Sequence, residues 1–518
     1  MPTAHFAAPR SVPLFAVGRT ADHRPGRFLL PILLLLGLTL TGCTSNQDKK
    51  SGPPDLDRLY AQKLEWSDCE EAKCTTVEVP IDYESPEEGT VTLQVRVIPA
   101  TGKGGKHLFI NPGGPGGSVI GGYDDYMADA LGKEVRELYD VVAVDPRGVG
   151  SSEPIDCLSD EDLYQLNADD PTPDDQGERT KFDKQWKQFA SQCREKSGEL
   201  VDHMTTEETA RDFDIVRDAL GSKTFDWFGV SYGTRLGATY ATLFPNRVGR
   251  MVLDAADDPS LELVEATLIQ SKGFEVALRA YVEDCVKQES CPLGTEPNAA
   301  IRKVSSLLES LDTKPMKTSD ADRPLTENLA SFGITWPLYD KEAWPDLTKS
   351  FAAAMDGNGT PLLDSAHEYF YWQPEEESFG DNIFEVFPIV LCQDWEERVP
   401  AEDAPAHAKR FTKASPVFGE SWASGMVWCG GIPKSDHSQP AIDASESAPI
   451  VVIGTTRDPA TPYAQSIDLA NQLGSAVHVT REGDGHGAYD AGNSCIDDLV
   501  DTYLARGTVP KNKTVCKE

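Results

Sequence analysis

The sequence lacks the patterns that mark several common classes of functional site. It has no C-x-x-C pair and no H-E-x-x-H motif, so a metal centre has no support and we expect no metal ion or other cofactor. Basic residues are scarce, with 48 Lys and Arg against 84 Asp and Glu and a formal charge of −36. This balance does not favour nucleic-acid binding, and no nucleic-acid partner is expected. An apolar fraction of 39% in 518 residues indicates a globular chain of one large or two ordinary domains.

The apolar run near the N-terminus is too short to span a bilayer. Phe28–Leu40 has thirteen residues, which fits the core of a signal peptide, and it is followed by Cys43 in the sequence L-T-G-C. This ending resembles the lipobox of bacterial lipoproteins, in which the cysteine is lipidated. We predict a lipoprotein signal peptide over residues 1–42, a lipid on Cys43 that holds the protein at the membrane, and a polar tether over residues 43–58. The alternative is an ordinary secretory signal; both forms predict an exported protein, either a cell membrane lipoprotein or a secreted one.

Ten cysteines follow Cys43. In an exported protein this even number indicates up to five disulfides, although the sequence alone leaves their connectivity open. Chain order suggests the pairs Cys69 with Cys74, Cys157 with Cys193, Cys285 with Cys291, Cys392 with Cys429, and Cys495 with Cys516.

Residues 229–233 read G-V-S-Y-G, the pattern of a nucleophile elbow centred on Ser231. The aromatic-rich run Thr224–Phe228 before it favours a buried strand, and Arg235–Phe244 after it favours a helix. A serine on so tight a turn between strand and helix is held in a strained backbone conformation that exposes its hydroxyl. The pattern alone is weak, so a catalytic serine needs partners elsewhere in the chain.

Strand and helix patterns alternate across residues 107–254. This alternation predicts a mainly parallel, doubly wound sheet, and the helix before Ser231 begins with a capping box formed by Thr205 and Glu208. Ligands of such sheets bind at the carboxyl ends of the strands. The strands expected besides the serine strand are His107–Ile110, Tyr139–Val144, Met251–Leu253, Pro449–Gly454 and Ala476–Val479.

The pattern changes over residues 259–444, which carry helical stretches with tryptophans and prolines between them and no convincing series of buried strands. This segment is predicted to be an inserted helical cap domain. The expected fold is therefore α/β, with a core formed by residues 59–258 and 445–518 and interrupted by the cap. The helices expected in the cap are Leu261–Lys287, Ala299–Leu311 and Trp344–Met355.

Two residues after the cap can activate the serine. A serine hydroxyl is a poor nucleophile until a base takes its proton, and the base needs a carboxylate to set its tautomer. Asp458 follows one predicted strand and His486 follows the next, and the order Ser231, Asp458, His486 is that of the α/β-hydrolase triad. Asp484 is a rival for the role of the carboxylate, but it precedes His486 by only two residues. A turn-capping Asp458 and a surface His486 are the structural alternatives.

A glycine-rich loop, residues 111–118, follows the first strand of the alternating region. It has neither the Lys-Ser/Thr ending of a P-loop nor the spacing of a dinucleotide fingerprint. It lies where a hydrolase needs a backbone N–H directed at the developing oxyanion, and the alternative is a flexible loop without a role.

Five segments together resemble the proline-iminopeptidase type of α/β-hydrolase. The extent of the match, which includes cap elements and covers roughly residues 60–516, is similar to that of the secreted tripeptidyl aminopeptidases of actinomycetes. Relatives often have histidine before the glycine loop, where this chain has Asn111. The five segments are Asn111–Ser118, Asp145–Ser152, Gly229–Gly233, Arg457–Pro462 and Gly485–Gly487.

The resemblance implies the mechanism of a serine peptidase. Ser231 is expected to attack the carbonyl carbon, while His486 acts first as base and then as acid and Asp458 orients His486. The oxyanion is expected to be held by the backbone N–H groups of Tyr232 and Gly114, with Gly113 as the weaker candidate.

An exopeptidase must also bind the free α-ammonium group of its substrate. We predict that Asp394 binds it, with Glu396 and Glu397 as further candidates, because these acids form a cluster beside Cys392 in the cap. In so acidic a chain, ordinary surface acids are the alternative.

The resemblance therefore implies an extracellular serine exopeptidase of tripeptidyl aminopeptidase type, which releases short peptides or residues from peptide substrates with free N-termini. A carboxylesterase or lipase with the same triad is the alternative, because this fold does not choose between ester and amide. A non-catalytic binding module is a third possibility, which the complete triad argues against. The sequence does not indicate how many residues are released, the physiological substrate or the oligomeric state.

Overall fold

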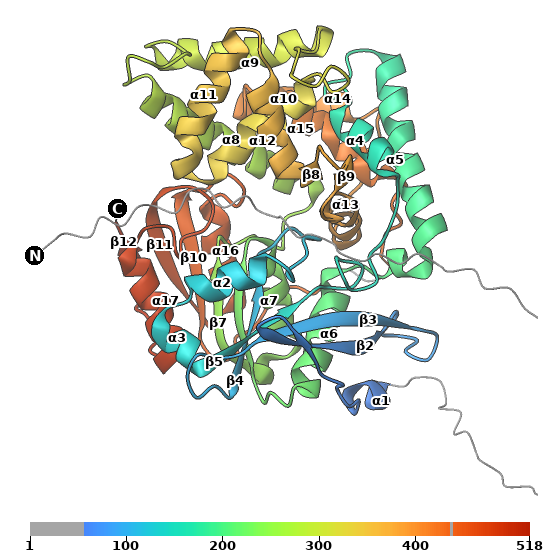
Figure 1. Cartoon of the computed structure of the whole chain (residues 1–518), viewed down its shortest axis with the longest axis vertical. Helices are drawn as coiled ribbons and strands as arrows, with labels where there is room; N and C mark the ends of the chain where they lie inside the picture. Colours follow the sequence, from blue (N-terminus) through green and yellow to red (C-terminus); the bar gives the residue numbers. More distant parts are fainter. Residues whose placement is uncertain (1–55, 436–438, 518) are drawn as a thin grey trace, which may run out of the picture.

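The computed structural model of the chain describes residues 56–435 and 439–517 (Figure 1). The predicted signal peptide, the lipidation of Cys43 and nearly all of the tether lie outside these residues. Across the described ranges, none of the helices combines the length and the apolar character needed to cross a membrane.

The described residues form one main sheet of ten strands in the order β1-β2-β3-β5-β4-β6-β7-β10-β11-β12. The strands β1, β2, β3 and β5 pair antiparallel, and all pairs from β5 to β12 are parallel, so the expected mainly parallel sheet is confirmed. The strands are β1 (Ser67–Cys69), β2 (Ala72–Pro80), β3 (Thr90–Ile98), β4 (Lys106–Asn111), β5 (Tyr139–Val144), β6 (Phe225–Val230), β7 (Val248–Asp254), β10 (Ile450–Arg457), β11 (Ala476–Asp484) and β12 (Thr514–Cys516).

Helices cover both faces of this sheet, which is why its central strands are apolar on both sides. In β5, Val142 and Val144 join the hydrophobic core beneath α6 and α7, whereas Val141 and Ala143 join the core beneath α2, α3 and α17. The helices outside the segment between β7 and β10 are α1 (Leu56–Tyr60), α2 (Tyr123–Ala130), α3 (Lys133–Leu138), α4 (Asp160–Ala168), α5 (Gln176–Ser197), α6 (Thr206–Ala219), α7 (Tyr232–Leu243), α16 (Ala464–Leu473) and α17 (Ser494–Arg506).

A helical segment is inserted between β7 and β10 and gathers above the sheet in Figure 1. It has its own hydrophobic core, so the predicted helical cap is part of the fold. A two-stranded ribbon of β8 (Trp372–Gln373) and β9 (Ser378–Phe379) interrupts it. Its helices are α8 (Leu263–Cys285), α9 (Pro297–Thr313), α10 (Glu327–Thr335), η3 (Trp336–Tyr339), η4 (Lys341–Ala343), α11 (Trp344–Met355), α12 (Thr360–Phe370), α13 (Ile383–Asp394), α14 (Ala404–Ala414), α15 (Gly419–Gly425) and η5 (Met426–Gly431).

The helix α4 belongs to the cap by its packing, although it precedes Ser231 in the chain. Its Tyr164 and Ala168 lie in the hydrophobic core of the inserted helices, and Arg323 of the cap lies over the ring of Tyr164 at 4.0 Å. The sequence placed these residues in the first part of the core, because chain order alone does not show which layer a helix packs against.

The first two strands after the cap run further than the sequence predicts. β10 continues to Arg457 and β11 continues to Asp484, with a register irregularity between Thr455 and Arg457. Asp458 therefore follows its strand directly, and Asp484 is the last residue of β11. The sequence predicts an earlier end for both strands because their polar ends lack the apolar pattern of the strand interiors.

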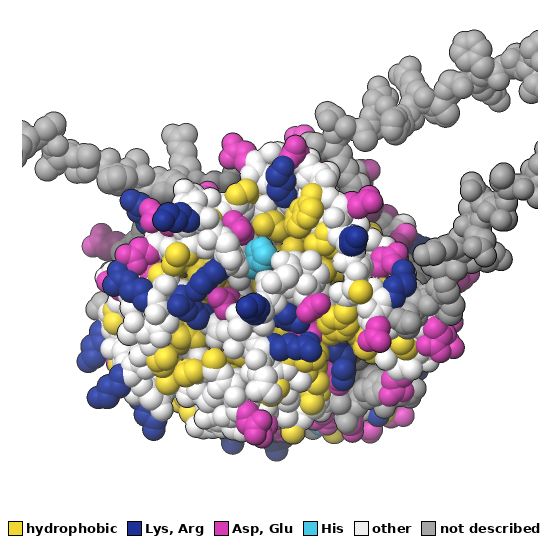
Figure 2. Space-filling view, turned by 90° about the horizontal axis from the view of Figure 1, so that it is seen from below, with side chains coloured by type: hydrophobic (Ala, Val, Ile, Leu, Met, Phe, Trp, Pro, Cys, Tyr) yellow, Lys and Arg dark blue, Asp and Glu magenta, His cyan; other side chains and the backbone are white. Residues whose placement is uncertain are grey.

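On the face opposite the cap, acidic side chains do not form one continuous patch. Figure 2 shows that face, where Lys and Arg side chains are interspersed with Asp and Glu around scattered hydrophobic side chains. On this face the excess of acid therefore does not form a single docking surface.

Five disulfides link the described residues, and each joins cysteines that follow one another in the chain. Cys157 and Cys193 are fully buried in the core, where their bond ties the loop after β5 to α5. The pairs are Cys69–Cys74, Cys157–Cys193, Cys285–Cys291, Cys392–Cys429 and Cys495–Cys516.

Replacing Cys157 and Cys193 together by alanine is expected to lower the free energy of unfolding by about 4 kcal/mol, because this bond restricts a long loop of the unfolded chain. The matched control is the double alanine variant of Cys69 and Cys74, whose short loop predicts a loss of about 2 kcal/mol. Denaturant unfolding of the oxidised proteins measures both losses. An equal or larger loss in the control would contradict the argument from loop length.

Candidate active site

Ser231 occupies a sharp turn between β6 and α7. Its φ of 57° and ψ of −126° are a strained combination for a residue with a side chain. A Cβ on Gly229 would collide with the main chain of Gly233, and a Cβ on Gly233 would lie 2.6 Å from the carbonyl oxygen of Asn111. The indole Nε1 of Trp227 donates to the oxygen of Gly233 at 3.0 Å. The two glycines of the motif are therefore required by close packing of strand, turn and helix.

The structure brings Asp458 and His486 into direct contact. His486 Nδ1 lies 2.8 Å from Asp458 Oδ1 and 3.0 Å from Oδ2. Asp458 is 2% exposed, and its Oδ1 also accepts from the backbone N–H groups of Ala460 and Thr461 at 3.0 and 2.9 Å. Because Nδ1 is used in this contact, Nε2 is the nitrogen that can exchange a proton with a serine.

The environment of His486 favours its charged form. Burial lowers the pKa of His486, but the charge of Asp458, the hydrogen bond to it and the charge of Asp254 together raise that pKa above its usual value. The imidazolium that forms when a base takes a proton is therefore stabilised here.

Asp484, the rival for this role, is engaged elsewhere. Both of its oxygens accept from the guanidinium of Arg457, and Lys341 Nζ lies 3.3 Å from Oδ2. The carboxylate that contacts His486 is Asp458.

Ser231 and His486 line the same cavity, which has a volume of about 1740 Å³ and lies between the carboxyl ends of the strands and the cap. Tyr232 and Gly114 also line it. The cap side of the wall is rich in aromatic residues, with Phe274, Phe332, Trp336, Tyr339, Tyr369, Tyr371, Phe384, Phe387, Trp395, Trp422 and Trp428. Such a wall suits a substrate with large apolar groups.

The glycine loop runs directly beside Ser231. A Cβ on Gly113 would lie 2.8 Å from the Cβ of Ser231, so only glycine fits there. The N–H of Gly113 donates to Asn111 Oδ1 at 3.0 Å, which leaves the next residue, Gly114, as the better donor to an oxyanion. The sequence analysis did not assign this role to the Asn111 side chain, although the residue was noted as a departure from relatives.

Asp145 holds the far end of the glycine loop, a role that the sequence analysis did not assign. Its Oδ1 accepts from the N–H groups of Val119 and Ile120 at 2.7 and 3.1 Å, and Ser118 Oγ donates to it at 2.9 Å. The strand before Asp145 was recognisable, but its partners lie about 25 residues earlier in the chain.

The predicted ammonium site is not at the cavity. Asp394 is fully buried, and its oxygens accept from the N–H and hydroxyl of Thr206 at 2.9 and 2.6 Å. Glu396 is exposed, and Glu397 accepts from the N–H of Val264 at the start of α8. None of the three is among the described residues that line the cavity. The acids that do line it are Asp125, Asp129, Asp257, Asp340, Glu342, Asp484 and Asp490.

The cap contacts the histidine loop through Tyr339. The main-chain N–H of His486 donates to the oxygen of Tyr339 at 2.8 Å, and the two rings meet edge to face with centroids 5.3 Å apart. The sequence gives no sign of this role for Tyr339. No local pattern links it to a residue 147 positions later in the chain.

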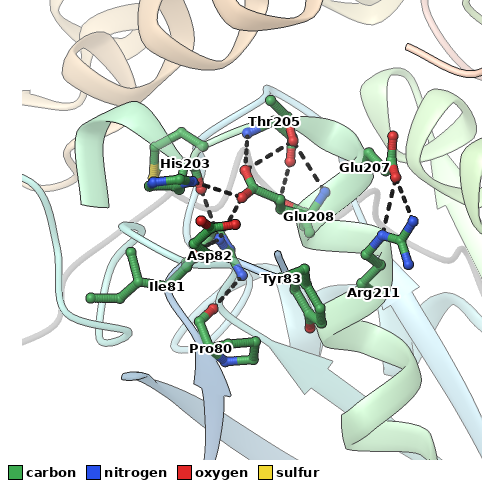
Figure 3. Close-up of polar contacts among 12 residues, drawn as sticks. Pro80, Ile81, Asp82, Tyr83, His203, Thr205, Glu207, Glu208 and Arg211 are labelled. Atoms are coloured by element: carbon green, nitrogen blue, oxygen red, sulfur yellow. Dashed lines mark hydrogen bonds and ion pairs between the residues drawn. The ribbon is translucent and has the colours of Figure 1, made fainter. Parts of the chain in front are cut away.

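Two groups of side chains have metal-like spacing in the described part of the chain. In the first, Asp82, His203 and Glu208 point toward one another (Figure 3), and His203 Nδ1 lies 3.0 Å from Glu208 Oε1. Arg147 Nη1 lies 3.7 Å from the same oxygen and supplies a positive charge, so we assign no metal to this group. The second group consists of Asp170, Asp312 and Glu327.

The chain is similar in sequence to known enzymes. A family model described as TAP-like protein matches residues 415–516. The chain is 34% identical to "Serine protease Hip1" of Mycobacterium tuberculosis over 93% of this chain and 96% of that protein. It is 32% identical to "Carboxylesterase B" of the same organism, with the same two coverages. It is 31% identical to "Tripeptidyl aminopeptidase" of Streptomyces lividans, over 88% of this chain and 86% of that protein.

Substituting Gly113 by alanine is expected to slow the reaction of Ser231 with a fluorophosphonate about 100-fold, because the new methyl group displaces the serine or the loop. Gly121→Ala is the matched control: its φ of 94° is also positive, but a Cβ there meets nothing within 4 Å. The labelling rate measures the effect, and a melting curve separates it from unfolding. Equal labelling of both variants would contradict the proximity argument.

Proposed function

Because the chain belongs to the TAP-like family of α/β-hydrolases, whose named relatives include serine peptidases, we propose that it is a serine exopeptidase that acts on peptides with free N-termini. More specifically, we propose an exopeptidase of the tripeptidyl aminopeptidase type. Short peptides or single residues are the products.

Three side chains carry the proposed reaction. Ser231 Oγ attacks the carbonyl carbon of the scissile amide, and His486 Nε2 takes the hydroxyl proton and then gives it to the leaving amine. Asp458 holds His486 by Nδ1 and stabilises the imidazolium. Water then hydrolyses the acyl-enzyme by the same steps in reverse order.

The oxyanion of each tetrahedral intermediate is proposed to accept from the N–H groups of Tyr232 and Gly114. Both residues line the cavity beside Ser231, and Tyr232 is the first residue of α7, where the helix dipole favours negative charge. Each such donor contributes about 2.7–4 kcal/mol of transition-state stabilisation.

The observation that carries this proposal is the combination of a strained Ser231 and an Asp458-bound His486 in the wall of one cavity. Strain of this kind persists only where surrounding packing enforces it, and it is characteristic of functional residues. No cofactor enters any step.

A peptide is the proposed substrate because the cavity combines an aromatic wall with several carboxylates. Aromatic side chains offer apolar contact to peptide side chains, and acids in the same wall can bind an α-ammonium group. Asp484 is the least suitable of these acids because Arg457 and Lys341 already neutralise it.

We propose that the protein is exported and held at the membrane by a lipid on Cys43. Five disulfides support export, because such bonds form and persist in oxidising compartments. The lipobox-like sequence supports the lipid, and an ordinary secreted form is the alternative.

A carboxylesterase is the second candidate function. It is favoured by the relative named Carboxylesterase B, which matches nearly the whole chain. The proposed triad performs either reaction, so only substrates can distinguish the two.

The purified protein beginning after Cys43 is expected to cleave a chromogenic tripeptide amide with a free amino group and to lose that activity when the amino group is acetylated, because the ammonium group is then absent. Single-residue amides and a short-chain ester complete the set of substrates. Steady-state kcat/KM measures each.

Ser231→Ala is the control, and it should abolish every activity. Hydrolysis of the ester without any amide turnover would contradict the peptidase proposal in favour of the carboxylesterase. Equal cleavage of free and acetylated tripeptides would contradict the exopeptidase assignment.

The value of kcat/KM is expected to fall as the pH is lowered through the pKa of His486, because only the neutral imidazole can act as base. That pKa is raised, so the fall should be centred above the ordinary histidine value of 6.5. Asp458→Asn removes the charge that stabilises the imidazolium, so the fall should move to lower pH while kcat drops by about 10⁴-fold.

Asp484→Asn is the matched control, since it removes a carboxylate two residues before His486 that contacts Arg457 instead. Its pH profile should keep the position seen in the unmodified protein. A larger loss in this variant than in Asp458→Asn would reverse the assignment of the two acids.

A further inference from the structure

Asp254 is a buried carboxylate that the proposed mechanism does not use. It is the last residue of β7 and is 1% exposed. In the sheet, β7 lies between β6, which leads to Ser231, and β10, which leads to Asp458. Asp254 therefore lies between the strand that carries the nucleophile and the strand that carries the acid.

Hydrogen bonds connect Asp254 to the main chain of Ser231 and to the loop that carries His486. Its main-chain oxygen accepts from the N–H of Ser231 at 3.0 Å. Its side-chain Oδ2 accepts from the N–H groups of Ala488 and Tyr489, each at 2.9 Å, and these residues follow His486 in the loop after β11. A single residue thus fixes the backbone of the nucleophile and the backbone that carries the base.

The other side-chain oxygen of Asp254 takes no part in these hydrogen bonds. Oδ1 is buried and has no hydrogen-bond partner among the described residues. Burial raises the pKa of Asp254 above its usual value, and the backbone donors of Tyr489, Ala488 and Ala255 and the charge of His486 offset only part of this rise. The same pair interaction raises the pKa of His486.

We propose that Asp254 is a positioning residue, which sets the spacing between Ser231 and His486 and places a second negative charge beside the imidazolium that forms during catalysis. The proposal rests on the proposed roles of Ser231 and His486 but not on the identity of the substrate. An exopeptidase and an esterase would depend on Asp254 equally.

The groups that face His486 come from three elements. Asp458 follows β10 and bonds to Nδ1, Asp254 ends β7, and Tyr339 of η3 covers the ring. Burial raises the pKa of Tyr339 well above its usual value, so Tyr339 stays neutral and does not compete with the two carboxylates. The loss of Asp254 leaves Asp458 as the remaining carboxylate of this set.

The test compares Asp254→Asn with Asp226→Asn in the mature, oxidised protein. Asp226 is a buried aspartate near the opposite end of β6, where it accepts from the hydroxyl of Tyr139 at 2.7 Å and the N–H of Arg250 at 2.9 Å. The probe is an alkyl fluorophosphonate, which reacts with any serine activated by a base. Its second-order labelling rate is measured from pH 5 to pH 9, and melting temperatures are recorded for both variants.

Asp254→Asn should label roughly ten to a hundred times more slowly at its optimum, because a neutral amide accepts more weakly than a carboxylate from the two N–H groups that hold the loop of His486. The acid limb of the profile should also move to lower pH by about half a unit or more, because the imidazolium loses a nearby opposite charge. In Asp226→Asn, the acid limb of the pH profile should stay at the pH seen in the unmodified protein, whether or not the melting temperature changes. A folded Asp254→Asn variant with the rate and limb of the unmodified protein would overturn the proposal.

Hydrogen exchange in the unmodified protein gives a second measurement if Asp254→Asn does not fold. The amides of Ala488 and Tyr489 should exchange as slowly as those of the central strands, because Asp254 accepts from both. Exchange at the rate of an open loop would overturn the proposal. An unmodified protein that the fluorophosphonate does not label would overturn the serine mechanism as well, whereas labelling without peptide cleavage would contradict only the peptidase assignment.

Discussion

The contact between His486 Nδ1 and Asp458 is the interaction on which the rest of the site depends. It exists because β10 and β11 pair in parallel register, so the residues that follow the two strands emerge side by side. A parallel sheet brings together residues that are distant in sequence whenever each one follows a strand. The same rule brings Ser231, which follows β6, to the wall of the same cavity. The sheet therefore determines the geometry of the site, and the loops supply its chemistry.

The parts of the site that were predictable from sequence have short, local signals. Ser231 lies in a five-residue motif, and Asp458 and His486 each follow an apolar strand, so pattern and chain order were enough to nominate the three residues. Asp254 and Tyr339 have no such signal, because their partners lie 234 and 147 residues away in the chain. The sequence also predicts the strands of the fold where they are apolar. It places the ends of β10 and β11 too early, because those ends are polar.

The prediction for Asp394 shows why charge alone is a poor guide in an acidic chain. Several acids here are internal parts of the scaffold rather than surface groups. Arg147 pairs with Asp212 at 2.6 Å with both side chains fully buried, and Arg235 lies between Asp257 and Asp394. Burying a carboxylate is costly unless a positively charged or hydrogen-bonding partner compensates for the lost hydration. The sequence alone does not show which residue is that partner. A cluster of acids beside a cysteine therefore could not be distinguished from a buried ionic network.

The hydrogen bond from the N–H of His486 to the carbonyl oxygen of Tyr339 makes the cap a structural part of the site. The cap therefore cannot be exchanged without changing a contact of His486. A chimaera that exchanged residues 259–444 for the cap of a relative would also exchange the acceptor that holds the main chain of His486. Recombination of this family by swapping whole caps would then change turnover and selectivity together. The separable unit for engineering is the cap without η3, and the junction between the two parts runs through Tyr339.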